Sequence, residues 1–367
     1  MLEDAKISPK QLILLIVISR MVITITFFPI LDSPPGNQDV WLALLLSIPI
    51  HLLLSVPIYL LWKRFPNQSF VEYSQTILGR AGKLIGLLYV LYFLHDVSMF
   101  LYRWSAFLTT AIMPETPVLF ILIFLLPFCA YAVLKGFEVI ARFAELFAPF
   151  IFAGFIIIFL LLAKDMDLKV FTPFLEKSFL SILFGALVAT LRTSEILIFA
   201  MLLPYVNIKK AKEVKLIFLS TFSIFTFLWI ICVIVVLSTL GLDLPRVLQF
   251  SYFDAVRLVN IGGFIERIES IHLSMWLISG YLRVALYFYV IVIGLGQVLG
   301  LKSYKPLVLS ILTILIPISL ALQTDIADLN QFLDYHIEPW YNLFFIFLIP
   351  VILLSIAMIR KQGEIKP

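Results

Sequence analysis

The fold of this chain is indicated by the stretch at residues 183–203, which reads LFGALVATLRTSEILIFAMLL. Apolar runs at 183–189 and 196–203 enclose a segment, Thr190 to Glu195, in which five of six residues are polar. The stretch has about the 20 residues that a helix needs to cross the hydrocarbon of a bilayer. Its polar residues would then lie near mid-membrane, where they are unfavourable in an intact lipid-facing helix. We therefore predict a spanning helix that is broken at the polar cluster, where freed backbone N–H and C=O groups can hold a ligand.

The composition of the whole chain also points to lipid as its surroundings. Of the 367 residues, 62% are hydrophobic and 14% are charged, whereas soluble domains carry about 25% charged residues. The apolar runs are continuous and long, which favours helices over a β-barrel with its alternating segments of roughly 10 residues. A helix pairs its backbone groups within one segment, as hydrocarbon requires. The small net charge of +4 gives no reason to expect a nucleic-acid partner.

Ten candidate spans follow one another along the chain. They lie at approximately 11–31, 41–61, 86–110, 117–134, 144–163, 180–204, 214–240, 270–298, 306–322 and 340–359. We predict an all-α integral membrane protein with a single transmembrane domain over 1–367. Five helices in each half, about 11–163 and about 180–359, make an inverted repeat with discontinuous helices 1 and 6. Short interfacial helices are expected at 69–80 and 245–259.

The Lys and Arg residues of the short loops predict how the chain is oriented in the membrane. They number 16 on the side that holds both termini and 6 on the opposite side. Both termini are therefore expected in the cytoplasm, and an even number of spans agrees with that placement. The sequence thus predicts a multi-pass protein of the cell membrane that is surrounded by membrane lipid.

Ionisable residues inside the spans are candidates for function, because they are costly in hydrocarbon and usually face the interior of a bundle. The intramembrane candidates are Arg20, Asp96, Arg192 and Arg283. Of these, Asp96 in span 3 and Arg283 in span 8 can form a structural ion pair. Helix 1 resembles helix 6 in carrying a polar cluster, so the candidate ligand-binding residues are Thr24, Thr26, Thr193, Ser194 and Glu195.

A purely structural role for these polar residues is the alternative. Such groups can form interhelical hydrogen bonds and ion pairs that only hold the bundle together. The hydroxyls of Thr24 and Thr26 can also bond to the preceding turn of their own helix.

The sequence contains no motif that would support catalysis or a bound cofactor. Three histidines lie on three separate helices, without Cys or carboxylate partners at ligand spacing, so no metal site is expected. Glycines near the end of span 8 follow no strand, which excludes a nucleotide-binding loop. Both cysteines lie inside apolar runs and are interpreted as core residues. These residues are His51, His95, His272, Gly294, Gly296, Gly300, Cys129 and Cys232. We therefore expect no enzymatic activity.

Six short motifs occur in a characteristic order along the ten spans. They are DVW at 39–41, FP at 65–66, ILGR at 77–80, PETP at 114–117, GFEVIARFAE at 136–145 and GFIERIE at 263–269. With these motifs the chain resembles the B-subunit (permease-like) family of bacterial spore germination receptors. That family belongs to the amino acid–polyamine–organocation superfamily.

The resemblance implies a fold in which broken helices 1 and 6 form the site and helices 3 and 8 flank it. It implies a subunit that senses a small nutrient, expected to be an amino acid, and signals germination in the spore inner membrane. Its partners would be an A-type subunit and a lipoprotein C-type subunit. The ligand would lie between Thr24–Thr26 and Thr193–Glu195. Helix 1 lacks glycine between Gln11 and Leu31, unlike most transporters of the superfamily, which counts against a conventional carboxylate cradle.

Two other functions are compatible with the same polar residues. The first is an amino-acid or cation symporter in which Glu195 or Asp96 serves as a proton site. The second is an ion or water conduit along a buried column of Arg20, Asp96 and Glu195.

Overall fold

The structure is a computed structural model that describes every residue except 1, 4–5, 27–28, 260–267, 322–331 and 364–367. Its described residues form helices and no β-strand. The main helices are α1 (Pro9–Thr24), α2 (Val40–Arg64), α3 (Phe70–Leu78), α4 (Arg80–Phe107), α5 (Val118–Lys135), α6 (Phe137–Leu162), α7 (Phe179–Leu191), α8 (Glu195–Leu202), α9 (Ala211–Leu240), α10 (Leu244–Val247), α11 (Ser251–Arg257), α12 (Glu269–Leu299), α13 (Lys305–Ala321), α15 (Glu338–Leu343) and α16 (Ile349–Ile359). The prediction of an all-α membrane protein is confirmed.

The number of spans differs from the expected ten. Among the described residues, seven helices are long and apolar enough to cross a membrane, or eight if the bent pair α7–α8 counts as one span. The spans predicted at 11–31 and 306–322 correspond to α1 and α13, which have only 16 and 17 residues. A straight span needs about 20 residues. The count of ten is therefore not confirmed, and the division into two repeats stays a prediction.

The predicted break in helix 6 is present. Helix α7 ends at Leu191, α8 begins at Glu195, and the two are bent by 43° relative to each other. Helix α1 also ends early, at Thr24, and a short 3-10 helix at Pro29–Asp32 follows it. The two discontinuous elements of the fold thus lie where polar residues interrupt the apolar runs.

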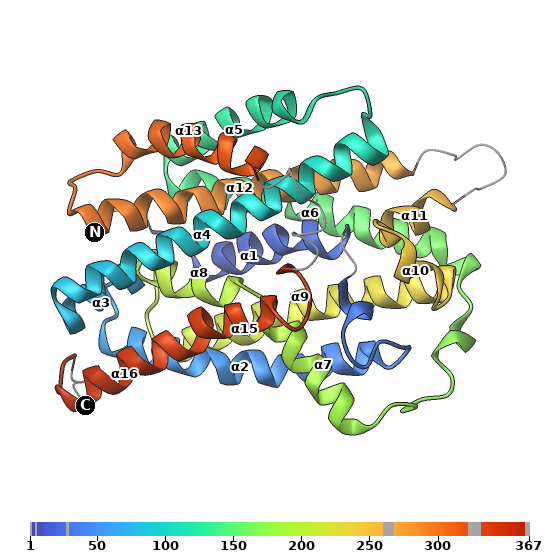
Figure 1. Ribbon diagram of the computed structural model, residues 1–367, viewed down its shortest axis with the longest axis horizontal. Coiled ribbons are helices and arrows are strands. Elements are labelled where there is room, and N and C mark those ends of the chain that lie inside the picture. Colours follow the sequence, from blue (N-terminus) through green and yellow to red (C-terminus); the bar gives the residue numbers. More distant parts are fainter. Residues whose placement is uncertain (1, 4–5, 27–28, 260–267, 322–331, 364–367) are drawn as a thin grey trace.

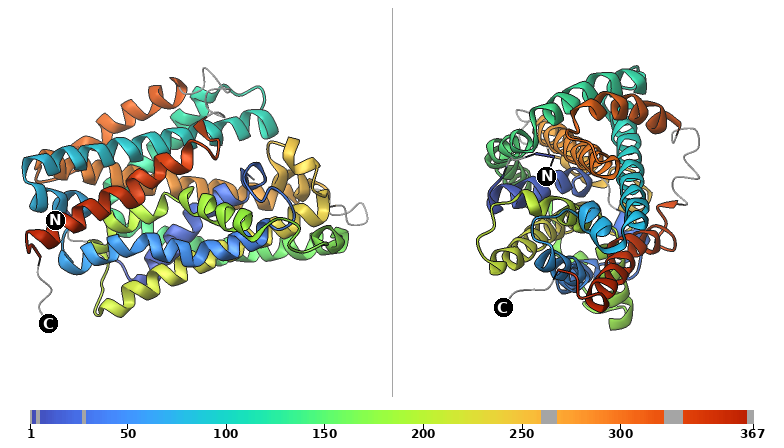
Figure 2. Two further views of the ribbon diagram at one scale, coloured as in Figure 1. Left: turned by 60° about the horizontal axis from the view of Figure 1, so that its bottom comes forward. Right: turned by 90° about the vertical axis from the view of Figure 1, so that its left-hand side faces the viewer.

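Helix α12 forms the centre of the bundle (Figures 1 and 2). In its most apolar 18 residues 89% are buried, the largest share of any candidate span. It packs against α1, α4, α5 and α6, while α2 packs against α7 and α9 on another side. A helix that is apolar on all faces needs neighbours all around it, and α12 meets that requirement.

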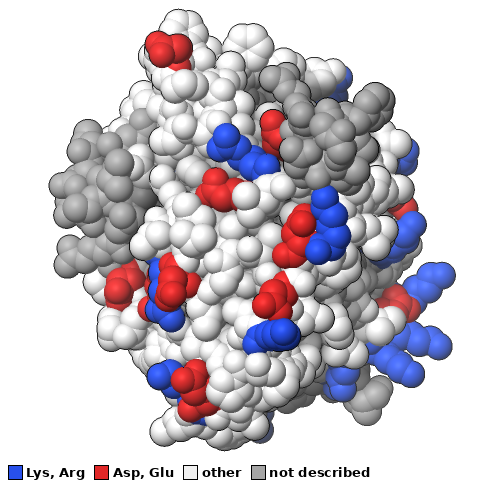
Figure 3. Space-filling model, turned by 90° about the vertical axis from the view of Figure 1, so that its right-hand side faces the viewer, with Lys and Arg blue, Asp and Glu red and all other residues white. Residues whose placement is uncertain are grey.

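The two ends of the bundle differ. Both termini lie at one end, together with α3, and the short helices α10 and α11 lie at the other (Figure 1). Helix α3 lies within the predicted interfacial range 69–80 and α11 within 245–259, whereas α10 begins at Leu244, just before the second range. On the end opposite the termini, acidic and basic side chains are interspersed (Figure 3). Which end faces the cytoplasm stays a prediction from the loop charges.

The N-terminal segment closes the bundle at the end that holds the termini. One carboxylate oxygen of Glu3 accepts the backbone N–H of Phe137 at 3.1 Å. The other accepts the hydroxyls of Tyr289 at 2.8 Å and Tyr304 at 3.1 Å. Four residues on, the N–H of Ile7 donates to the Tyr205 carbonyl at 3.0 Å. This segment therefore ties α6, α12 and the end of α8 together.

A substitution at Gly136, which separates α5 from α6, tests the contact of the N-terminal segment with this end of the bundle. Its φ of +101° is one that side chains rarely adopt, and an added Cβ would lie 2.4 Å from a carboxylate oxygen of Glu3. We expect Gly136→Ala to lower the free energy of unfolding by about 1–3 kcal/mol through backbone strain, and further through the clash. Thermal unfolding of the purified protein in detergent measures the loss.

Gly79→Ala is the matched control, because Gly79 has a φ of +61° and nothing within 4 Å of an added Cβ. Gly136→Ala should cost more stability than the control, and Glu3→Ala in the same chain should remove the excess. Equal losses of unfolding free energy in the two glycine variants would mean that the Glu3 side chain does not contact Gly136.

Candidate ligand site

The break between α7 and α8 consists of Arg192, Thr193 and Ser194. In the last turn of α7, just before the break, the Thr190 hydroxyl donates to the Ala186 carbonyl of the preceding turn at 2.9 Å. Serine and threonine hydroxyls that compete in this way for backbone groups weaken a helix interior. Helix α8 then restarts with Glu195 as its first residue, where a negative charge interacts favourably with the helix dipole.

Glu195 is the centre of a buried charge network. One of its oxygens lies 2.5 Å from Nη1 of Arg283 on α12, and the other lies 3.3 Å from Nη1 of Arg20 on α1. The same Arg20 nitrogen donates to the carbonyl of Arg192 at 3.1 Å. The three paired side chains are 0%, 2% and 4% exposed. Arg20 thus contacts both the first carbonyl of the break and the first side chain after it.

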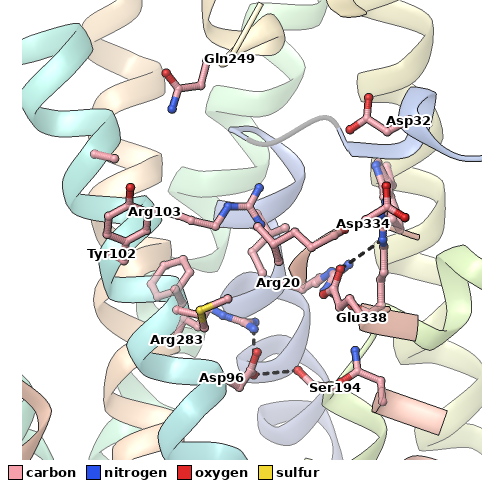
Figure 4. Close-up of a pocket in the computed structure, with 18 of the residues that line it drawn as sticks. Arg20, Asp32, Asp96, Tyr102, Arg103, Ser194, Gln249, Arg283, Asp334 and Glu338 are labelled. Carbon is pink, nitrogen blue, oxygen red and sulfur yellow. Dashed lines mark hydrogen bonds and ion pairs between the residues drawn. The ribbon is translucent and has the colours of Figure 1, made fainter. Parts of the chain in front are cut away.

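Asp96 on α4 connects this network to the space beside it (Figure 4). Its carboxylate lies 3.5 Å from Nη2 of Arg283, which is the ion pair expected across helices 3 and 8. It also accepts the hydroxyl of Ser194 at 2.9 Å, and Ser194 contacts the Tyr287 hydroxyl at 2.7 Å. The Asp96 side chain is 28% exposed, so this carboxylate can still reach a ligand.

Arg192 extends in another direction, toward the last span. Its Nε lies 3.3 Å from a carboxylate oxygen of Glu338, the first residue of α15. Its Nη2 donates to the Leu333 carbonyl at 2.9 Å. The break is therefore linked to α1, α4 and α12 through hydrogen bonds and to the last span through an ion pair.

A cavity of about 640 Å³ lies beside these groups (Figure 4). Its volume falls within the roughly 300–1,000 Å³ typical of small-molecule sites. Five arginines and four carboxylates line it, namely Arg20, Arg103, Arg192, Arg246, Arg283, Asp32, Asp96, Asp334 and Glu338. Burial raises the pKa of Asp32, although the positive charge of Arg192 opposes that shift. This lining suits a polar ligand that carries charge.

The structure divides the predicted site residues into two groups. Those that line the cavity are Ser194, Arg20, Asp96, Arg192 and Arg283. The others are buried and do not line it: Glu195, Thr193, Thr24 and Thr26. In helix 1, Thr24 donates to the Arg20 carbonyl at 3.4 Å and Thr26 to the Val22 carbonyl at 2.5 Å. A ligand contact by these four residues stays a prediction.

Several residues of the cavity were not in the predicted site. Arg103 lies seven positions after Asp96, so helical periodicity alone places both on one face of α4. Glu338 fell just outside the predicted span 340–359 and had no apparent partner in the sequence. Trp229, whose ring lies 5.3 Å from the Arg20 guanidinium, had no signal beyond its apolar helix.

The buried pairs of Glu195 give a prediction about stability. Glu195→Gln leaves the buried guanidinium of Arg20 without its counter-charge and leaves Arg283 with only its 3.5 Å contact to Asp96. Breaking a buried ion pair costs about 3–5 kcal/mol. The matched control is Glu138→Gln, because Glu138 and its partner Arg142 are 41% and 70% exposed. That exposed pair contributes about 0.3–0.5 kcal/mol. Reversible unfolding in mixed detergent micelles measures both variants, and similar small losses would contradict the network.

Comparison with known proteins gives one family. The family described as "Spore germination protein" matches residues 6–327. Spore germination protein KB of Bacillus subtilis (strain 168) is 26% identical over 372 aligned positions, which cover 100% of this chain and 98% of that protein. Spore germination protein YndE of the same organism is 25% identical, over 89% of each chain.

Among solved structures, the substrate-bound outward-open state of a Na⁺-coupled sialic acid symporter has a TM-score of 0.63 to this chain. The match covers 87% of this chain and 76% of the symporter at 12% identity. At that identity the likeness concerns the fold alone. With a helical membrane fold and a family match over most of its length, the chain belongs to the permease-like spore germination proteins.

Proposed function

We propose that this chain is the membrane subunit of a nutrient-germinant receptor, which binds a small nutrient in the cavity and signals germination. The observation that carries the proposal is the cavity at the α7–α8 break, which is lined by five arginines and four carboxylates, among them the partly exposed Asp96. An amino acid fits such a lining. Guanidinium groups bind a carboxylate, and Asp96 with the Ser194 hydroxyl offers acceptors to an ammonium group.

A receptor must also convert binding into a change of conformation, so its ligand must favour one state over another. The contact between Asp96 and Arg283 is the longest ion pair of the network, at 3.5 Å. A ligand ammonium that takes over the Asp96 carboxylate would weaken this link between α4 and α12. A ligand carboxylate that binds Arg192 would compete with Glu338 at the start of α15. Either exchange gives the ligand a differential affinity for two arrangements of the helices.

The location and the partners of the proposed receptor are inferred from the family, and the orientation of the chain is inferred from its loop charges. The subunit would act in the inner membrane of the spore, with both termini in the cytoplasm. It would assemble with an A-type subunit and a lipoprotein C-type subunit. These partners would read the rearrangement of the helices around the cavity.

A symporter for an amino acid and a cation is the second candidate, and the likeness to a Na⁺-coupled symporter favours it. Glu195 is a poor proton site for it, because both of its oxygens already contact arginines. Asp96 is the better candidate, since its side chain is 28% exposed and lines the cavity. The two functions therefore differ in whether the ligand of Asp96 crosses the membrane.

The receptor function is tested by the germination of spores that lack other nutrient receptors. We would compare wild type, a deletion, Asp96→Asn and the control Glu138→Gln across a panel of amino acids, measuring release of small molecules from the spore core. The deletion should lose the response to one nutrient. Asp96→Asn should raise its half-maximal concentration at least about tenfold, because a hydrogen bond to a charged group contributes about 1.5–3 kcal/mol. The control should respond like wild type.

Two results would count against the proposal. A deletion that keeps every response would exclude the receptor function. A deletion that loses a response which Asp96→Asn retains in full, at equal protein abundance, would place the ligand outside this cavity.

Uptake into proteoliposomes separates the receptor from the symporter. With the nutrient identified above, we expect no accumulation beyond equilibrium under a proton or sodium gradient. Accumulation that Asp96→Asn abolishes and Glu138→Gln preserves would favour the symporter instead.

A further inference from the structure

The middle residue of the α7–α8 break faces away from the cavity. Arg192 and Ser194 line the cavity, but Thr193 between them is 0% exposed and does not. Its hydroxyl lies 3.1 Å from Nε2 of His51 on α2 and 3.2 Å from the Ala189 carbonyl on α7. The break is thus attached to a neighbouring helix through its central side chain.

His51 is held firmly enough to serve as an anchor. Its Nδ1 lies 2.7 Å from the Ser47 carbonyl one turn earlier in α2. Its ring packs against Phe222 at 4.8 Å and Phe225 at 5.3 Å between ring centres, both on α9. The imidazole is 0% exposed, so turning it would leave buried nitrogen atoms without partners, which is costly. The tautomer that donates from Nδ1 to Ser47 leaves Nε2 to accept the Thr193 hydroxyl.

The anchor decides where the neighbouring side chains point. The three residues of the break lie between two helices that hold their backbone only in part. The N–H groups of Arg192 and Thr193 donate to carbonyls of α7, and the Ser194 carbonyl accepts an N–H of α8. The side chain of Thr193 adds a constraint from α2. Fixing the central side chain on α2 restricts the backbone torsions on both sides of it. Arg192 and Ser194 then emerge toward the opposite side, where α4, α12 and the cavity lie.

We propose that His51 is a positioning residue for the ligand site: its hydrogen bond to Thr193 turns Arg192 and Ser194 into the cavity. His51 touches no ligand, since it does not line the cavity. Its effect on germination rests on the proposed function, whereas its effect on side-chain direction does not. Thr193, predicted as a ligand contact, acts in this proposal as the other half of the anchor.

The yield of a disulfide between two introduced cysteines measures the direction of the side chain at position 194, and this measurement needs no nutrient. Ser194 and Asp96 are in side-chain contact at 2.9 Å, so the pair Asp96→Cys and Ser194→Cys should cross-link under mild oxidation in lipid nanodiscs. The native Cys129 and Cys232 are buried and free, so they contribute little background. The control pair is Val90→Cys with Gly294→Cys, since a Cβ on Gly294 would lie 3.1 Å from the Val90 side chain.

We expect His51→Phe and Thr193→Val each to lower the yield of the 96–194 cross-link at least threefold. Because both remove the same hydrogen bond, the double variant should resemble either single variant. Thr193→Ser keeps the hydroxyl and should keep the yield. The control cross-link should not change in any of them. An unchanged 96–194 yield in Thr193→Val, which conserves the shape of the side chain, would overturn the proposal even if His51→Phe folds poorly.

A germination assay separates a positioning role of His51 and Thr193 from a purely structural one. In spores with full subunit abundance, Thr193→Val should raise the half-maximal nutrient concentration, while Thr193→Ser should restore it. A lower cross-link yield together with an unaltered nutrient response would uphold the positioning and contradict the ligand site. Loss of both would support the two proposals together.

Discussion

The carboxylate of Glu195 is the charge on which the centre of this structure depends. It stands at the first position after a break in a spanning helix and is paired with Arg283 at 2.5 Å and Arg20 at 3.3 Å. Without these partners a charge at this depth would be prohibitive. Without the carboxylate, Arg20 would lose its ion pair and Arg283 would keep only the longer contact with Asp96 at 3.5 Å. The three residues therefore require one another, and together they join α1, α8 and α12 around the interruption.

The cavity follows from this arrangement. The Glu195 pairs are buried, whereas the pairs at the edge of the network include more exposed carboxylates: Asp96, 3.5 Å from Arg283, is 28% exposed, and Glu338, 3.3 Å from Arg192, is 20% exposed. A polar ligand can exchange with these outer contacts without exposing the inner ones. The proposed anchoring of Thr193 by His51 serves the same site. Side chains at a helix break can bind a ligand only if they point in a defined direction.

Much of the fold could be predicted because it rests on local properties. Continuous apolar runs identified most of the spanning helices, and the polar residues 190–195 identified the break. Opposite charges on two spans predicted the contact of Asp96 with Arg283. The expected count of ten spans is not confirmed, because α1 and α13 have only 16 and 17 residues as described.

By itself, then, the sequence determined that the chain is a helical membrane protein, where its sixth predicted span breaks, and which charges lie within the spans. Each of these depends on the hydropathy of neighbouring residues. Only the tertiary structure decided which side chains face the cavity and which face a neighbouring helix. Thr193 contacts a histidine 142 positions away, and Arg192 pairs with Glu338 on the last span. Such partners depend on how helices pack and on backbone torsions in a non-helical segment, and no local pattern encodes either.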